Sequence, residues 1–178
     1  MSALQQDLFR DSLTSGAAMS LTTARCFILA CGNTLRGDDG VGPWLAEWAE
    51  EKFRSEAGVR VLVRQQWTPE LAEDIARAHS VLFIDCSIDS APGSVRLVPV
   101  EPAAPAQGLA THHLGAPELL ALGCELYGSL PLNAQLLTIG AGSTELCEAF
   151  SDPVKAALPE ACRLLEETVL QVLTNEGQ

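Results

Sequence analysis

The chain has 178 residues, and its 23 acidic against 11 basic side chains give a formal net charge of −12 at pH 7. Nucleic-acid-binding proteins neutralise phosphates with Lys and Arg, so this charge argues against a nucleic-acid partner. A hydrophobic content of 47% is ordinary for a single globular domain, and no apolar run reaches the roughly 18 residues of a transmembrane helix, so no membrane partner is expected.

Three regions are expected along the chain. Residues 1 to 24 lack sustained periodicity, which predicts a disordered leader, residues 25 to 174 form a single domain, and residues 175 to 178 form a short tail. The leader has no apolar h-region, so it does not resemble a secretory signal, and Met19 is an alternative start. The six cysteines lack CxxC or other paired metal spacing, and most lie in apolar runs, which predicts buried thiols in a reducing cytoplasm.

Strand-like and helix-like segments alternate from residue 26 onwards. Apolar runs predict strands at Cys26–Cys31, Val59–Val63, Ser80–Ile84, Ser94–Val100 and Ala134–Ile139. Helical patterns follow the first strand to about Arg54, then run from Thr68 to about His79, from Ala116 to about Tyr127, and from Ser151-Asp152-Pro153 onwards. In the second of these helices Thr68 is the expected cap and Pro69 the first helical residue.

The order of these segments predicts the fold class. The connection before the fourth strand is too short for a crossover helix, so that strand is expected to be antiparallel to its neighbour. We predict an α/β fold: a three-layer α/β/α sandwich with a mainly parallel twisted sheet of about five strands and helices on both faces.

Two adjacent acids, Asp38 and Asp39, lie in the glycine-rich turn that joins the first strand to the first helix. This is the carboxyl edge of a strand, where open α/β sheets bind their ligands. Asp is also a good helix N-cap, and a carboxylate near a helix N-terminus gains about 0.3–1 kcal/mol without any function. That interpretation suits Asp38. Since one cap needs one carboxylate, Asp39 is the candidate for chemistry.

The run from Cys31 to Gly42, CGNTLRGDDGVG, resembles the N-terminal motif of the hydrogenase maturation endopeptidases. These enzymes clip a C-terminal tail from the large subunit of nickel-iron hydrogenases. The chain departs from the family pattern at Ala30, where a glycine is usual, and has Asp39 where some members have glutamate. The segment from Phe150 to Pro159 also resembles the entry to the family's final helix, so the resemblance spans nearly the whole domain.

Two further residues extend the candidate site. Asp85 follows the strand Ser80–Ile84 at its carboxyl end, and His112 stands on a loop before a helix. Two carboxylates and an imidazole suit a transition metal such as nickel or zinc, whereas the simpler interpretation is surface acids and a capping histidine. In the family, the metal-contacting residues are an acid in the glycine-rich turn, an aspartate after the middle strand and a histidine before a helix. By this resemblance they match Asp39, Asp85 and His112.

The histidine assignment rests on register alone. His113 is the adjacent rival, and His112 is preferred because Gly115 and the run Glu118-Leu119-Leu120 then stand in the family's spacing.

The resemblance implies a cytoplasmic endopeptidase that removes the C-terminal extension of the nickel-loaded precursor of a nickel-iron hydrogenase large subunit. Asp39, Asp85 and His112 are then both the catalytic residues and the metal contacts, nickel is supplied by the precursor, and no organic cofactor is expected. The chain has no HExxH helix, no GxSxG elbow and no cysteine within a catalytic pattern, which leaves recognition through a metal as the simplest mechanism.

Other functions fit parts of the sequence. A noncatalytic binding module with the same fold is one alternative. Gly32-Asn33 after a strand is similar to peptidyl-tRNA hydrolases, but these need a basic face. A nucleotide-binding protein is disfavoured because the first turn has no GxGxxG and its two aspartates would repel a phosphate.

Overall fold

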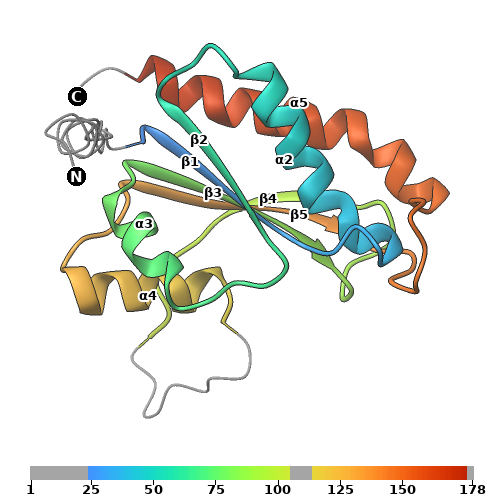
Figure 1. The fold of residues 1–178 in the computed structure, drawn as a ribbon, viewed down its shortest axis with the longest axis horizontal. Helices are drawn as coiled ribbons and strands as arrows, with labels where there is room; N and C mark the ends of the chain where they lie inside the picture. The colour runs from blue at the N-terminus through green and yellow to red at the C-terminus, as the bar shows by residue number, and fades with distance from the viewer. Residues whose placement is uncertain (1–23, 105–113, 176–178) are drawn as a thin grey trace, which may run out of the picture.

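Five strands form one sheet, with helices packed against both of its faces (Figure 1). The computed structural model describes residues 24–104 and 114–175, and within them the strands are β1 Cys26–Cys31, β2 Val59–Arg64, β3 Ser80–Ser87, β4 Val95–Pro99 and β5 Asn133–Gly140. Their order is β2-β1-β3-β5-β4, and all neighbours are parallel except β4, which is antiparallel to β5. The predicted sheet and its antiparallel edge strand are confirmed.

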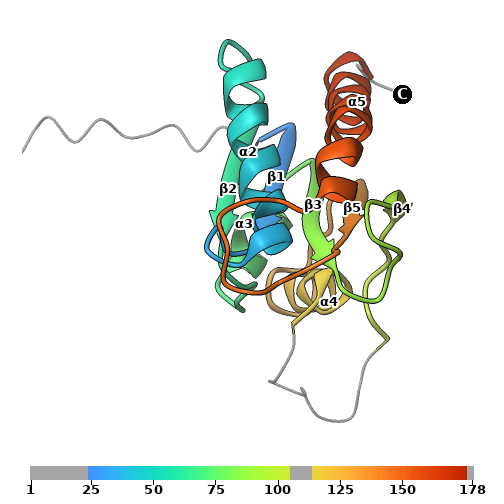
Figure 2. The ribbon, with the colours of Figure 1, turned by 90° about the vertical axis from the view of Figure 1, so that its right-hand side faces the viewer.

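Helices cover both faces of the sheet (Figure 2). The helical elements are a 3₁₀ helix Gly37–Gly40, α2 Val41–Lys52, α3 Leu71–Arg77, α4 Ala116–Tyr127 and α5 Asp152–Thr174. Side chains of α2 and α5 join one buried cluster with the sheet, and those of α3 and α4 join a second cluster on the opposite face. The predicted three-layer α/β/α sandwich is therefore confirmed. No helix in the described ranges has the length and apolarity to cross a membrane.

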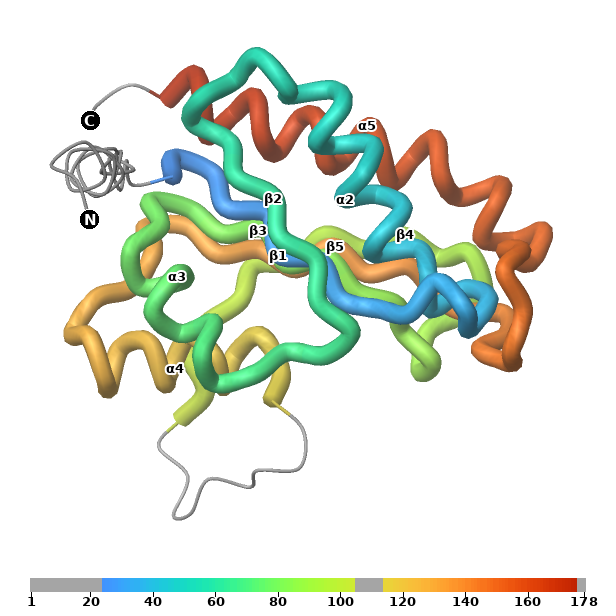
Figure 3. The backbone as a smooth tube through the Cα atoms, in the orientation of Figure 1, coloured from blue at the N-terminus to red at the C-terminus, as the bar shows by residue number. Residues whose placement is uncertain are grey.

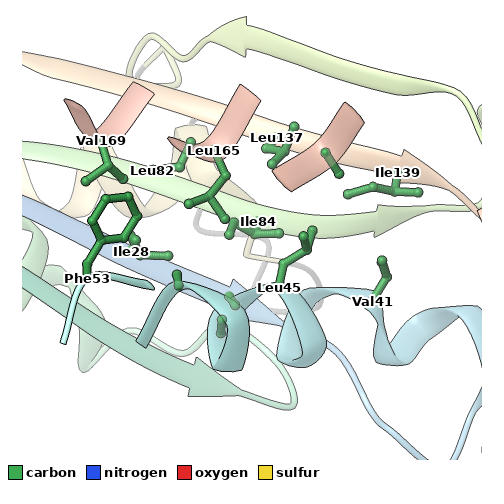
Figure 4. Close-up of a cluster of buried hydrophobic side chains, with 14 of the residues drawn as sticks. Ile28, Val41, Leu45, Phe53, Leu82, Ile84, Leu137, Ile139, Leu165 and Val169 are labelled. Atoms are coloured by element: carbon green, nitrogen blue, oxygen red, sulfur yellow. The ribbon is translucent and has the colours of Figure 1, made fainter. Parts of the chain in front are cut away.

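Strand β1 lies in the interior and is buried on both sides. Ile28 and Ala30 face the α2/α5 cluster, whereas Phe27 and Leu29 face the α3/α4 cluster, and all four are at most 1% exposed. This explains the unbroken apolar run, because a parallel strand covered on both faces has no polar side. Figure 4 shows the larger cluster between the sheet and its two helices. Each such fully buried aliphatic or aromatic side chain contributes about 1.5–3 kcal/mol.

The strand order places a topological switch point between β1 and β3. From β1 the chain passes to β2 on one side of the sheet, whereas the chain after β3 continues to β4 and β5 on the other side (Figure 3). The loops that leave the carboxyl ends of β1 and β3 therefore diverge, and open α/β sheets usually bind their ligands in the crevice at such a point.

Three local predictions were wrong. Strand β3 continues to Ser87 because it pairs with β5 beyond the end of β1, so Asp85 lies within the strand and opposite Thr138 instead of after it. Helix α3 begins at Leu71 with Glu70 as its N-cap. Thr68 neither caps it nor starts it, because a tight turn of i to i+3 hydrogen bonds to the carbonyls of Thr68 and Pro69 comes first.

All six cysteines are free, but the prediction of buried thiols holds fully only for Cys26. Cys31, Cys86 and Cys162 are half-buried. Cys124 lies on the outer side of α4 and Cys147 in the loop after β5, and both are exposed. The predicted leader up to residue 23, the last three residues of the tail, and both His112 and His113 lie outside the described residues.

Glycine is required where β1 meets the following helix. An added Cβ at Gly42, in the first turn of α2, would lie 2.1 Å from the carbonyl oxygen of Cys31 at the end of β1. No real Cβ tolerates such a distance, so either the helix or the strand end would have to shift.

We therefore expect Gly42→Ala to lower the free energy of unfolding by about 1–3 kcal/mol, the cost of forcing extra atoms into a packed contact. Gly123→Ala is the matched control, because Gly123 is also helical and its added Cβ would come no closer than 3.3 Å to another residue. Its effect should stay within about 1 kcal/mol. Urea denaturation measures both, and equal effects of the two substitutions would contradict the proposed contact.

Candidate active site

The turn after β1 is shaped by its first two residues. Gly32 has a φ of +142°, which disfavours a side chain, and the Oδ1 atom of Asn33 accepts a hydrogen bond of 3.0 Å from the backbone N–H of Leu35. The side chain of Asn33 thus bonds to its own turn, and Gly32 takes the unusual backbone conformation. This turn leads directly into the 3₁₀ helix that contains both acids.

Asp38 is fully buried and its carboxylate accepts four hydrogen bonds. Oδ2 accepts from the backbone N–H groups of Gly142 and Ser143 at 2.7 and 2.9 Å and from the hydroxyl of Ser151 at 2.7 Å. Oδ1 accepts from the backbone N–H of Ser151 at 2.7 Å. The side chain thus connects the turn after β1 to the turn after β5 and to the start of α5. It does not cap its own helix, because the N-cap of α2 is Gly40, which has no side-chain cap.

Backbone hydrogen bonds reinforce the same junction. The N–H of Gly37 donates to the carbonyl of Cys147 at 2.5 Å, and the N–H of Cys147 donates to the carbonyl of Leu35 at 3.1 Å. The N–H of Asp38 donates to the carbonyl of Ser143 at 3.0 Å. Two loops more than 100 residues apart in sequence are therefore held together as one unit at the carboxyl edge of the sheet.

Burial alone would raise the pKa of Asp38, but the hydrogen bonds from Ser151, Ser143 and Gly142 stabilise the carboxylate and hold its pKa below the usual range. Asp38 is therefore ionised at neutral pH. Because all four of its acceptor contacts are made within the protein, it is a structural residue and not a ligand.

Asp39 has the opposite character. Its side chain is half-buried, and one carboxylate oxygen, Oδ2, accepts a hydrogen bond of 2.9 Å from the backbone N–H of Asn33. Within residues 24–104 and 114–175, no donor pairs with the other oxygen. The side chain is thus held in place by one oxygen while the second remains available, which is the arrangement a ligand-binding carboxylate needs.

Asp85 lies beside Asp39 across the switch point. It stands one residue beyond the last pair of β3 with β1, Ala30 and Ile84, and so lies where these two strands cease to pair. Burial raises the pKa of its carboxyl to about 6, the negative charge of Asp39 adds to this, and the hydrogen bond of 2.8 Å from the N–H of Cys86 opposes it. The effect of Asp39 shows that the two carboxylates share one electrostatic environment.

No cation neutralises this environment among the described residues. None of the salt bridges in residues 24–104 and 114–175 involves Asp38, Asp39 or Asp85. Two half-buried carboxylates, each with one oxygen that has no donor among the described residues, therefore leave an excess of negative charge at the crevice. A divalent cation or a cationic group would relieve it.

Two thiols beside these acids were not singled out from the sequence. Burial raises the pKa of Cys31 to about 12, with contributions from Asp85 and Asp39, and the pKa of Cys86 is also raised to about 12 by burial and the neighbouring carboxylates. Both therefore remain protonated at neutral pH and cannot act as thiolate nucleophiles. Their adjacency in sequence to Gly32 and Asp85 was the available signal.

The third predicted residue is not described by the structure. His112 and His113 fall in the segment before Leu114, just ahead of helix α4. Within the described ranges, no group of three or more His, Cys, Asp or Glu side chains is arranged to hold a metal ion. The predicted set of Asp39, Asp85 and His112 thus stays a prediction, with two of its members brought together by the fold.

Comparisons with known proteins agree with this architecture. The hydrogenase expression/formation protein HoxM of Azotobacter vinelandii is 29% identical over 154 residues, which cover 83% of this chain and 73% of HoxM. The NiFe hydrogenase maturation protease HybD from Thermococcus kodakarensis is 27% identical with a TM-score of 0.62, over 81% of this chain and 98% of that structure. The E. coli hydrogenase maturating endopeptidase HybD has a TM-score of 0.65 at 19% identity, over 83% and 93%, which shows the fold alone. No protein-family model matches the chain.

The fold is therefore that of the hydrogenase maturation proteases. In sequence, too, the chain is related to proteins of hydrogenase maturation, which confirms the resemblance that the motif from Cys31 to Gly42 indicated.

Asp38→Asn tests the structural role of the buried carboxylate. The amide retains one acceptor oxygen but places an NH₂ group against backbone donors, so we expect the free energy of unfolding to fall by about 2–4 kcal/mol at neutral pH. Asp39→Asn is the control. It can keep its single hydrogen bond from Asn33, so it should cost about 1 kcal/mol or less. Chemical denaturation measures the free energy of unfolding of both variants. An equal loss in the two would contradict a structural role for Asp38 that Asp39 does not share.

Asp85 should make stability depend on pH in a defined direction. Its folded pKa of about 6 lies above the ordinary 3.8, so the folded state holds this proton more tightly and is stabilised by it below about pH 4. That stabilisation is lost as the pH rises through 6. Asp85→Asn has no such titration, so its stability relative to the wild type should increase by on the order of 2 kcal/mol between pH 4 and pH 7. A difference that is constant with pH in urea denaturation would contradict this environment.

Proposed function

We propose that this chain removes the C-terminal extension from the nickel-loaded precursor of a nickel-iron hydrogenase large subunit, and that it does so in the cytoplasm. The coarser function, an endopeptidase of hydrogenase maturation, follows from its relatives. The observation that carries the finer proposal is the pair Asp39 and Asp85, two carboxylates without a cationic partner in the described residues, at the switch point of the sheet.

The ligand atoms of the candidate site suit a metal ion that accepts both oxygen and nitrogen ligands. Asp39 offers a free oxygen, and Asp85, with a pKa of about 6, is mostly ionised at neutral pH. With an imidazole from His112 the set becomes mixed oxygen and nitrogen, which suits nickel. In this proposal the nickel belongs to the substrate and arrives inside the precursor. A protein site with an open position and an excess of negative charge can recognise a metal that is already bound elsewhere.

The chain's own residues then have distinct roles. Asp39 and Asp85 contact the metal and so align the precursor's C-terminal segment with the crevice. Asp38 keeps Asp39 in position through the junction of the two loops. The metal supplies charge for polarising the scissile carbonyl or for activating a water molecule. Neither protonated thiol takes part in bond cleavage, because neither forms a thiolate at neutral pH.

The decisive assay uses the precursor subunit with and without nickel, with the product weighed by mass spectrometry. We expect cleavage of the nickel-loaded form only. Asp39→Ala and Asp85→Ala should each reduce the cleavage rate by more than the roughly 10- to 100-fold that is typical of residues behind a metal ligand. Thermal denaturation of each variant shows that it is folded.

Two histidine variants complete this assay. Loss of cleavage in His112→Ala but not in His113→Ala supports the predicted ligand, and the reverse result reassigns it by one residue. Equal processing of both forms of the precursor would contradict recognition through nickel. A wild-type chain that binds the precursor but cleaves neither form would instead be a noncatalytic binding module.

A further inference from the structure

A groove runs along the outer side of α2, at the edge of the sheet formed by β2. Its volume is about 920 Å³, and it is lined by α2, the turn that follows this helix, and the first residues of β2. Figure 2 shows β2 and α2 on the left of the molecule, with α5 on the right. The larger apolar side chains that line the groove include Val59 and Val61 from the strand and Trp44 and Trp48 from the helix.

The strand beside the groove has a free edge. Among the described strands β2 pairs only with β1, so its other side presents backbone N–H and C=O groups without strand partners. An exposed edge of this kind readily accepts an additional extended segment, whose backbone forms hydrogen bonds while its side chains occupy the neighbouring pockets.

The rim of the groove is acidic. Glu47, Glu50, Glu51 and Glu56 line it, with Arg54 as the one basic lining residue among those described. Arg54 is already engaged by Glu51. The other nearby cation, Lys52, is held toward α5 by an ion pair of 2.8 Å with Glu166. The surplus negative charge therefore favours a partner that carries Lys or Arg.

One end of the groove is connected to the candidate active site. The ring of Trp44 packs edge-on against Phe150 at a centroid distance of 6.5 Å. The next residue along the chain, Ser151, donates two hydrogen bonds to Asp38. A segment that lies in the groove thus ends beside the loop junction that holds Asp39.

We propose that this groove binds an extended segment of the precursor subunit that lies along the free edge of β2 and presents Lys or Arg together with apolar side chains. The inference rests on the proposed function, because it names the substrate as the occupant. The apolar side chains contact the two tryptophans and two valines. The basic groups pair with Glu47, Glu50 and Glu56, the rim glutamates that Arg54 does not engage.

The test compares two charge reversals of equal size. Glu47→Lys lies in the groove, and Glu125→Lys lies on α4, which packs on the opposite face of the sheet, and both side chains are exposed. The binding of the purified precursor subunit to each full-length variant is measured by biolayer interferometry, and cleavage is measured in parallel. We expect Glu47→Lys to raise Kd and KM about 5- to 10-fold with little change in kcat, and Glu125→Lys to leave all three near the wild-type values. The salt dependence of KM should weaken in Glu47→Lys only.

The outcomes separate the two proposals. Equal effects of both reversals would show a general charge effect and overturn the groove as a binding site, as would wild-type binding by Glu47→Lys. Trp48→Phe is a second, milder variant, which should weaken binding in the same assay. If the wild type binds the precursor through the groove but cleaves no form of it, the groove stands and the proposed function fails.

Discussion

The buried carboxylate of Asp38 is the interaction on which the active-site end of the molecule depends. A charge removed from water is costly unless it is paired or hydrogen-bonded. Here the compensation comes entirely from hydrogen bonds, two to backbone N–H groups of the turn after β5 and two to the first residue before α5. Charge-assisted hydrogen bonds are about twice as strong as neutral ones. The same bonds that solvate the charge therefore join three parts of the chain into one rigid edge.

This arrangement assigns different chemistry to two neighbouring acids. Asp38 accepts all its hydrogen bonds from groups of the protein, and its position fixes the short 3₁₀ helix that also carries Asp39. Asp39 uses one oxygen for the backbone of Asn33 and leaves the other free. Asp85 approaches it from the neighbouring strand, and the negative charge of Asp39 helps to raise the pKa of Asp85. No ion pair within the described residues neutralises either carboxylate. A bound cation would lower that energy, which is why the proposed function assigns a metal-bearing substrate to this edge of the sheet.

The fold was predictable because its local signals agree with one another. The run from Phe27 to Cys31 is apolar at every position, as a strand buried on both faces must be, and Gly32 and Gly42 mark contacts that leave no room for a side chain. The partner of Asp38 was not predictable. Its donors are backbone groups more than 100 residues away, and a backbone N–H leaves no signature in a sequence.

The extent of β3 was missed for a similar reason. Its final residues are polar and are held in the sheet by pairing with β5 and not by their own propensity, so the strand seemed to end before Asp85. The early start expected for α3 was a different error. Thr68 does form local hydrogen bonds, but it forms them in the turn that precedes the helix. The proximity of Asp39 and Asp85 could be anticipated only because both lie near the carboxyl ends of neighbouring parallel strands. These ends meet at one edge of the sheet.

The helix that follows the two acids also sets the geometry between the groove and the crevice. Helix α2 has 12 residues, so at 1.5 Å per residue it is about 18 Å long. An extended segment that rises about 3.3 Å per residue spans this length with about five or six residues. Since Trp44 lies at the end of α2 that is next to the 3₁₀ helix, a segment anchored in the groove reaches Asp39 within a few residues of its last anchored side chain. In the proposed mode of binding, the groove and the candidate site would therefore contact one continuous stretch of the substrate, and the junction around Asp38 would keep their spacing constant.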